Sequence, residues 1–165
     1  MFDAAYWTRK LGLNPHPEGG YYKETYRSEG SLLLKNDGQA KSRQYATAIY
    51  FLMETGNFSA FHIIKSDELW HFYYGDPLEV FYIDLSGVLQ RILLGQNPEN
   101  GETLQALVPA SVWFASRPLK TGQYSLVGCT VSPGFDFEDF EMAKREELTH
   151  EFPAHQIIIE ELTRD

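Results

Sequence analysis

The sequence predicts a mainly β single domain, built as an antiparallel meander or jelly roll with a few short flanking helices. Aromatic residues make up 15% of the chain, with ten Tyr and eleven Phe, and they suit half-buried sheet surfaces better than a helical bundle. From Gln44 to Glu102, β-rich runs alternate with turn signals. These signals are TGN (55–57), KSD (65–67), GDP (75–77), SG (86–87) and NPENG (97–101). Because the 165 residues contain no repeat or linker, we expect residues 1–165 to form one domain.

Proline and glycine mark where strands begin and end on either side of this region. The segment PHPEGG (15–20) suits neither a helix nor a central strand, so a strand is expected to begin at Tyr21. Further strands are predicted near 104–108, 112–116 and 123–131, and SPG (132–134) ends the sheet.

Short helices are predicted at both ends of the chain. Residues 3–11 place apolar side chains on one face behind Asp3, a good N-cap, so this helix should cover the barrel. The acids that precede the bases in FDFEDFEMAKREEL match the helix macrodipole and predict a helix over 138–147. A closing helix is expected after Pro153. A final strand is the alternative, because residues 157–159 are three consecutive isoleucines.

Composition and charge exclude several classes of function. A formal net charge of −9 and a pI near 5.0 oppose binding to nucleic acid. No apolar run approaches the ~18 residues that a membrane span needs, and the first residues lack the order of a signal peptide, so a cytoplasmic protein is expected. The single cysteine, Cys129, reads as a small buried strand residue.

The stretch GNFSAFHIIKSDELWHFYYG (56–75) carries the candidate chemistry. Two strands joined by a tight polar turn aim side chains of like parity into one interior. If His62 points inward, then Ala60 and Ile64 do too. Across the turn, the candidate inward residues are Glu68, Trp70, Phe72 and Tyr74. A buried imidazole beside a buried carboxylate can share protons or hold a metal.

The same stretch resembles the first motif of the cupin superfamily, G-x5-H-x-H-x3-E-x6-G, which implies a double-stranded β-helix, the jelly-roll barrel. Gly56, His62, Glu68 and Gly75 stand at the motif's spacing. Ile64 replaces the second histidine, and Phe114 falls where the resemblance implies the last metal-binding histidine. With two ligands missing we expect no cofactor. The alternative is a divalent metal held by His62, Glu68 and His71, and His71 would need a bulge to turn inward.

Four longer segments are similar to the Cupin_5 family across nearly the whole chain, a resemblance that implies a fold and not a reaction. They are PHPEGGYYKETYRS (15–28), SAFHIIKSDELWHFYYGDPLE (59–79), VPASVWFAS (108–116) and LVGCTVSPGFDFEDFE (126–141). A weaker similarity links EGGYYKETYR to the entry strand of dTDP-4-dehydrorhamnose 3,5-epimerases, which are metal-free cupins. It implies that His62 is a general base that removes a proton next to a sugar carbonyl. The arginine expected before the glycine in that strand is absent, and Gly19 stands there.

Three hypotheses of function follow. The first is a metal-independent epimerase or isomerase for a small polar, sugar-like molecule, in which His62 is the base and Glu68 orients it. Tyr22, Glu24 and Trp70 would shape its pocket. The second is a binding protein without turnover, in which Ile64 and Phe114 mark a pocket adapted to recognition. The third is a metal-dependent cupin enzyme.

Several other residues have simpler interpretations. Glu24 and Arg27 can form an ion pair on an exposed strand. The three histidines outside the motif, His16, His150 and His155, read as solvent-facing residues. The acids from Asp136 to Glu141 read as charge at a helix N-terminus. We expect a homodimer in which the strand around 21–27 is exchanged between subunits.

Overall fold

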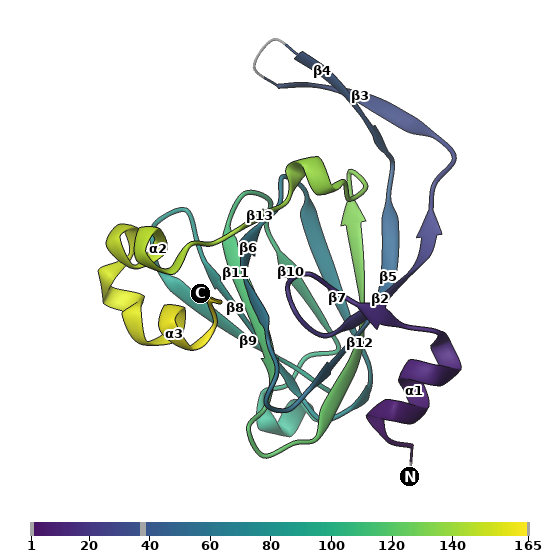
Figure 1. The fold of residues 1–165 in the computed structure, drawn as a ribbon, viewed down its shortest axis with the longest axis vertical. Coiled ribbons are helices and arrows are strands. Elements are labelled where there is room, and N and C mark those ends of the chain that lie inside the picture. The colour runs from purple at the N-terminus through teal and green to yellow at the C-terminus, as the bar shows by residue number, and fades with distance from the viewer. Residues whose placement is uncertain (1, 37–38, 165) are drawn as a thin grey trace.

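Two antiparallel sheets face each other and form a barrel, as the computed structural model of residues 2–36 and 39–164 shows (Figure 1). The first sheet has the order β1 (Asn14–Pro15), β2 (Tyr21–Arg27), β5 (Thr47–Glu54), β12 (Tyr124–Ser132), β7 (Asp67–Gly75) and β10 (Gln105–Val108). The second has the order β13 (Glu141–Met142), β6 (Ser59–Ile63), β11 (Trp113–Pro118), β8 (Leu78–Ile83) and β9 (Leu89–Leu94). From β5 to β8 the chain alternates between the two sheets, so the predicted mainly β jelly-roll barrel is confirmed.

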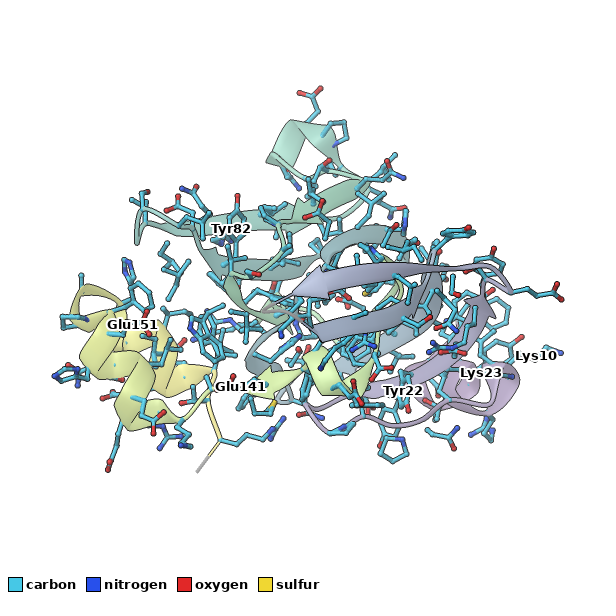
Figure 2. All side chains as sticks on the ribbon, turned by 90° about the horizontal axis from the view of Figure 1, so that it is seen from above. Lys10, Tyr22, Lys23, Tyr82, Glu141 and Glu151 are labelled. Atoms are coloured by element: carbon cyan, nitrogen blue, oxygen red, sulfur yellow. The ribbon has the colours of Figure 1, made fainter. Side chains whose placement is uncertain are left out.

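The main hydrophobic core lies between the two sheets. Phe51 and Trp70 of the first sheet belong to the same buried cluster as Val80 and Phe114 of the second, and all four are at most 1% exposed. Seen from above, Tyr22 of the first sheet and Tyr82 of the second lie on opposite sides of the barrel (Figure 2). Ile64 and Trp70 belong to this same cluster, and Phe72 packs against it, so alternate residues of the two strands border one shared interior.

A β-bulge in β7 changes the predicted set of inward side chains. Glu68 and Trp70 are buried and Phe72 packs against the core, as their parity predicts. The register between β12 and β7 then shifts by one residue, because Val127 pairs with Phe72 but Leu126 pairs with Tyr74. The prediction for Tyr74 was therefore wrong. Its ring lies on the outside, 39% exposed, and contacts the ring of Trp7.

The N-terminal helix covers the outer face of the first sheet. Helix α1 (Ala4–Leu11) begins after Asp3, whose carboxylate accepts a hydrogen bond of 2.7 Å from the backbone N–H of Tyr6. Ala4, Trp7 and Leu11 pack in one cluster with Leu52 and Leu126, which face away from the barrel interior. This predicted helix and its cap are confirmed.

The predicted helix over 138–147 was wrong. Residues 137–139 form a short 3₁₀ turn, η2 (Phe137–Asp139), the chain then joins β6 as β13, and α2 (Arg145–Glu151) starts only afterwards. The cause is Arg43, 5% exposed, whose guanidinium binds Asp136, Glu138 and Asp139. The acids bind this buried cation and no α-helix starts at them. Asp136 caps only the 3₁₀ turn, where its Oδ1 accepts a hydrogen bond of 2.9 Å from the backbone N–H of Glu138.

The chain ends in helices and not in a strand. The 3₁₀ turn η3 (Pro153–His155) leads into α3 (Gln156–Glu161), where Ile159 is fully buried and Ile157 is 78% exposed, as helical spacing requires. A further 3₁₀ turn, η1 (Pro98–Asn100), lies after β9. Among the described residues, no helix is long and apolar enough to cross a membrane.

A two-stranded hairpin that the sequence patterns did not predict projects from the barrel (Figure 1). It consists of β3 (Ser31–Asn36) and β4 (Gln39–Gln44), which pair only with each other. Arg43 attaches the base of this hairpin to the barrel, because its guanidinium binds the carboxylates of Asp136, Glu138 and Asp139. The same contacts hold residues 136–139 in place.

Candidate functional site

The barrel encloses a cavity of about 430 Å³, a volume typical of small-molecule sites. The groups that can exchange protons or form ion pairs in its wall include His16, Glu18, Glu24, Arg27, His62 and Glu68. Its apolar wall includes Tyr22, Ile49, Ile64, Val131, Phe135 and Phe137. Acid–base groups thus face a largely apolar chamber.

The loop before β2 places Glu18 in this cavity. Gly19 and Gly20 adopt φ values of +115° and +76°, which residues with a side chain rarely adopt. A Cβ atom at Gly19 would also lie 2.1 Å from the carbonyl oxygen of Phe58. The backbone N–H of Ala60 donates to the carbonyl oxygen of Glu18 at 2.9 Å, so strand β6 fixes the position of this loop.

The side chains of Glu18 and His62 meet inside the cavity. Oε2 of Glu18 lies 3.0 Å from Nε2 of His62, and both side chains are less than 10% exposed. The other ring nitrogen, Nδ1, lies 2.7 Å from the carbonyl oxygen of Ala60. Because a carbonyl oxygen can only accept, Nδ1 of His62 carries a proton.

Burial favours the uncharged forms of both partners. It lowers the pKa of His62 to about 4 and raises the pKa of Glu18 above its usual range. With Nδ1 already protonated and the ring neutral, Nε2 can only accept a hydrogen bond. The carboxyl group of Glu18 therefore donates, and the pair shares a single proton.

Glu68 supplies a second buried carboxyl group from β7. Burial raises its pKa to about 8, and a negative charge on the nearby Glu18, when that group ionises, acts in the same direction. The thiol of Cys129 and the indole N–H of Trp70 oppose this rise in the pKa of Glu68 as weak donors. The indole donor is weak because its nitrogen forms no hydrogen bond of ordinary geometry. Glu68 is therefore protonated at neutral pH and can donate a hydrogen bond into the cavity.

The structure brings most of the predicted site residues together. Tyr22, Glu24 and Ile64 line the cavity with His62 and Glu68. Two others lie in the core next to it. Phe114 places its ring centroid 4.0 Å from that of His62, and Trp70 is buried between the sheets.

His71, in contrast, does not reach this cavity. It lies on the other face of β7, where its ring nitrogens contact Thr130 Oγ1 and the side-chain amide of Gln105, each at 3.0 Å. The bulge that would turn it inward occurs after Phe72, too late to change its direction.

The residues present do not fit the metal that the cupin fold implies. The side chains of Ile64 and Phe114 are buried where two ligands would be needed, and the ring of Phe114 packs on His62. Within residues 2–36 and 39–164, no group of three or more His, Cys, Asp or Glu side chains is arranged to hold a metal ion.

Sequence reasoning missed several residues of the cavity wall, and the two that matter most for its chemistry are Glu18 and His16. Glu18 was not predicted as a site residue because it lies in a segment predicted to be irregular. The two glycines that follow it were the available signal, because they permit a backbone with positive φ that fixes the position of the preceding side chain. His16 was predicted to face solvent, which is wrong. Its side chain is 7% exposed, its ring stands edge-on to that of Tyr22, and burial lowers its pKa.

The mouth of the cavity carries an ion pair and an exposed ring. Nη2 of Arg27 donates to Oε2 of Glu24 at 2.6 Å, so the predicted ion pair is present, and both residues line the cavity. Phe137, from the segment that Arg43 holds, is 53% exposed beside them. Cys129 lines the interior as a buried strand residue, and burial raises the pKa of its thiol well above the usual range.

Known proteins resemble this chain in sequence and in structure. The model of the Cupin_5 family, described as cupin superfamily (DUF985), matches residues 5–143. An uncharacterized protein of Saccharomyces cerevisiae is 31% identical over 150 residues, which cover 84% of this chain and 74% of the yeast protein. A hypothetical protein from Leishmania major superposes with a TM-score of 0.91 at 37% identity, over 99% of this chain and all of its own. A protein from Shewanella oneidensis gives 0.88 at 38% identity, over 99% of each chain.

Proposed function

The chain belongs to the Cupin_5 family of the cupin superfamily, and from that premise we propose that its cavity binds a small polar molecule and moves a proton on it. The reaction class is an isomerisation or epimerisation, in which a proton leaves a carbon next to a carbonyl group and returns either to the neighbouring carbon or to the other face of the same carbon. The substrate class is a small, sugar-like carbonyl compound.

One observation carries this proposal, the contact between Glu18 and His62. The hydrogen bond from Nδ1 to Ala60 fixes the tautomer of His62, so Nε2 and the carboxyl group of Glu18 compete for one proton at 3.0 Å. Loss of that proton to solvent water leaves a carboxylate facing a ring nitrogen lone pair at close range, and this arrangement is a ready proton acceptor. A general base needs such a group inside a shielded cavity.

The proposed step uses both carboxyl groups. The deprotonated pair takes the proton from the substrate carbon, and the electron pair of that C–H bond moves into the carbonyl group to give an enol or enolate. The protonated carboxyl group of Glu68 donates a hydrogen bond to the oxygen where negative charge develops, a role that neutral buried carboxylic acids perform well. In an isomerisation the pair then delivers the proton to the neighbouring carbon, the former carbonyl oxygen gains the hydroxyl proton of the adjacent oxygen, and the carbonyl group has moved by one carbon. Glu68 thus acts on the substrate and not as the group that orients His62.

Exchange with solvent deuterium tests this proposal even before the substrate is identified. We expect the protein in D2O to replace the hydrogen next to the carbonyl in at least one member of a panel of uncharged aldoses and ketoses. Proton NMR follows the loss of that signal. Protein-free samples give the background rate, and a panel in which the protein adds nothing to that rate contradicts the proposal.

A binding protein without turnover is the second candidate, and the positions of Ile64 and Phe114 favour it. Both place buried apolar groups where the cupin motif has metal ligands. Ile64 lines the cavity, where it suits an apolar surface of a ligand, and Phe114 packs on His62 from the core. A molecule that is retained by the protein and recovered chemically unchanged, with no deuterium incorporated, would support this candidate over the proton-transfer reaction.

A further inference from the structure

The charge on the cavity wall bears on which molecules it admits. Glu24 and Asp136 line the cavity together with the buried acids Glu18 and Glu68. Burial lowers the pKa of both histidines in the wall, His16 and His62, so they are neutral at pH 7. Among the described residues that line the cavity, Arg27 is then the single permanent cation.

The donors of Arg27 are already occupied. Its Nε donates to Oε1 of Glu24 at 3.0 Å and its Nη2 to Oε2 at 2.6 Å, which is the two-point geometry of a strong arginine–carboxylate pair. Nη1 donates to Oε1 of Gln44 at 3.0 Å, and both terminal nitrogens lie 3.4 Å from the carbonyl oxygen of Phe135. A phosphate group entering the cavity would have to displace Glu24 to reach this guanidinium.

We propose that the cavity selects uncharged substrates over phosphorylated ones, and that Glu24 sets this selectivity by holding Arg27. Glu24 neutralises the cation on one side of the mouth. Of the other acids in the wall, Glu18 and Glu68 are protonated and Asp136 faces Arg43, so the wall offers an entering anion no free positive charge. The rings of Tyr22, Phe135 and Phe137 offer flat apolar surfaces that suit the carbon face of an uncharged sugar. This inference rests on the proposed use of the cavity as a small-molecule site, and it does not need proton transfer to occur.

The selectivity separates this chain from enzymes that act on nucleotide-linked sugars. A diphosphate carries negative charges that need free arginine or lysine donors or backbone N–H groups. In the described part of the chain, the cavity supplies one guanidinium, which is already bound to a carboxylate. The similarity of residues 18–27 to the epimerase strand therefore does not extend to the substrate.

A gain of phosphate binding in a Glu24 variant tests the inference. Glu24→Gln removes the counter-charge and keeps the shape of the side chain, so Arg27 becomes available to an anion. Binding of D-fructose and D-fructose 6-phosphate is measured by calorimetry, independently of any turnover. We expect the wild type to favour fructose, and we expect Glu24→Gln to bind the phosphate ester at least ~10-fold more tightly than the wild type does.

Two matched variants make the result specific. In Glu24→Gln/Arg27→Gln the gain should disappear, because the freed guanidinium is the source of the new affinity. Glu54→Gln makes the same charge change at an exposed position at the end of β5 and should give no gain. If Glu24→Gln binds the phosphate ester no better than the wild type, or if the wild type already prefers the ester, the inference is overturned. Absence of deuterium exchange with intact selectivity would instead contradict only the proton-transfer reaction.

Discussion

Replacing Glu18 with Gln is expected to slow deuterium exchange into the substrate by about 100- to 10,000-fold, the usual contribution of a general base. The amide is nearly the same size as the carboxyl group, and its NH2 can donate to Nε2 of His62 as the acid does. His62 therefore keeps its tautomer and its place. An amide does not accept and release a proton near neutral pH, so the variant loses only the proton-transfer step.

The readouts of this experiment separate a chemical role from a structural one. Initial exchange rates are followed by NMR over a range of substrate concentrations, and the thermal unfolding midpoint reports the fold. We expect the maximal rate to fall while the substrate concentration at half-maximal rate and the unfolding midpoint change little. His62→Gln should give a loss of similar size. A Glu18→Gln protein that exchanges within about threefold of the wild-type rate would show that Glu18 is not the proton acceptor.

The second large effect is expected in the pH dependence of stability. The pKa of Glu68 is raised from 4.5 to about 8, so the folded protein keeps a proton that the unfolded chain has released. Its stabilising contribution is complete below pH 4.5 and is lost as the pH rises to 8. The pKa of His62 is lowered from 6.5 to about 4, so this group makes the free energy of unfolding rise as the pH rises from 4 to 6.5. Between pH 6.5 and 8 Glu68 makes the main contribution, and Glu18, whose pKa burial also raises, acts in the same direction, so we expect the free energy of unfolding to fall by about 2 kcal/mol or more.

Urea denaturation at pH 6.5 and pH 8 measures this change, with Glu68→Gln as the matched variant. The glutamine cannot ionise, so its protein should lose much less stability over the same interval and should be more stable than the wild type at pH 8. Equal losses in the wild type and in Glu68→Gln would mean that other groups cause the pH dependence and that Glu68 is not held protonated in the folded state.

The sequence was sufficient to predict most of the barrel, because its strands carry strong local signals. Alternating side chains and glycine or proline turns define β5 to β12, and the parity argument placed His62, Ile64 and Glu68 in one interior. Parity failed at Tyr74, because the one-residue bulge before it depends on how β7 pairs with β12. No local pattern of β7 reveals that pairing.

The partner of His62 escaped sequence reasoning for a related reason. Glu18 is 44 positions away along the chain, and only the contact between its loop and strand β6 brings it to the imidazole. Likewise, the acids at 136–139 follow the charge order of a helix start, but Arg43, from a hairpin that was not predicted, binds them. Long-range ion pairs of this kind override local propensity.

The protonation state of His62 can be measured without any substrate, and the proposed chemistry depends on the one proton that His62 shares with Glu18. Nitrogen-15 NMR of labelled histidine distinguishes the two neutral tautomers and the charged ring. We predict that at pH 6 His62 is neutral, with a protonated Nδ1 and a hydrogen-bonded, unprotonated Nε2, and that this signal is altered in Glu18→Gln. A doubly protonated His62 ring at pH 6, or a proton on Nε2 alone, would contradict the account.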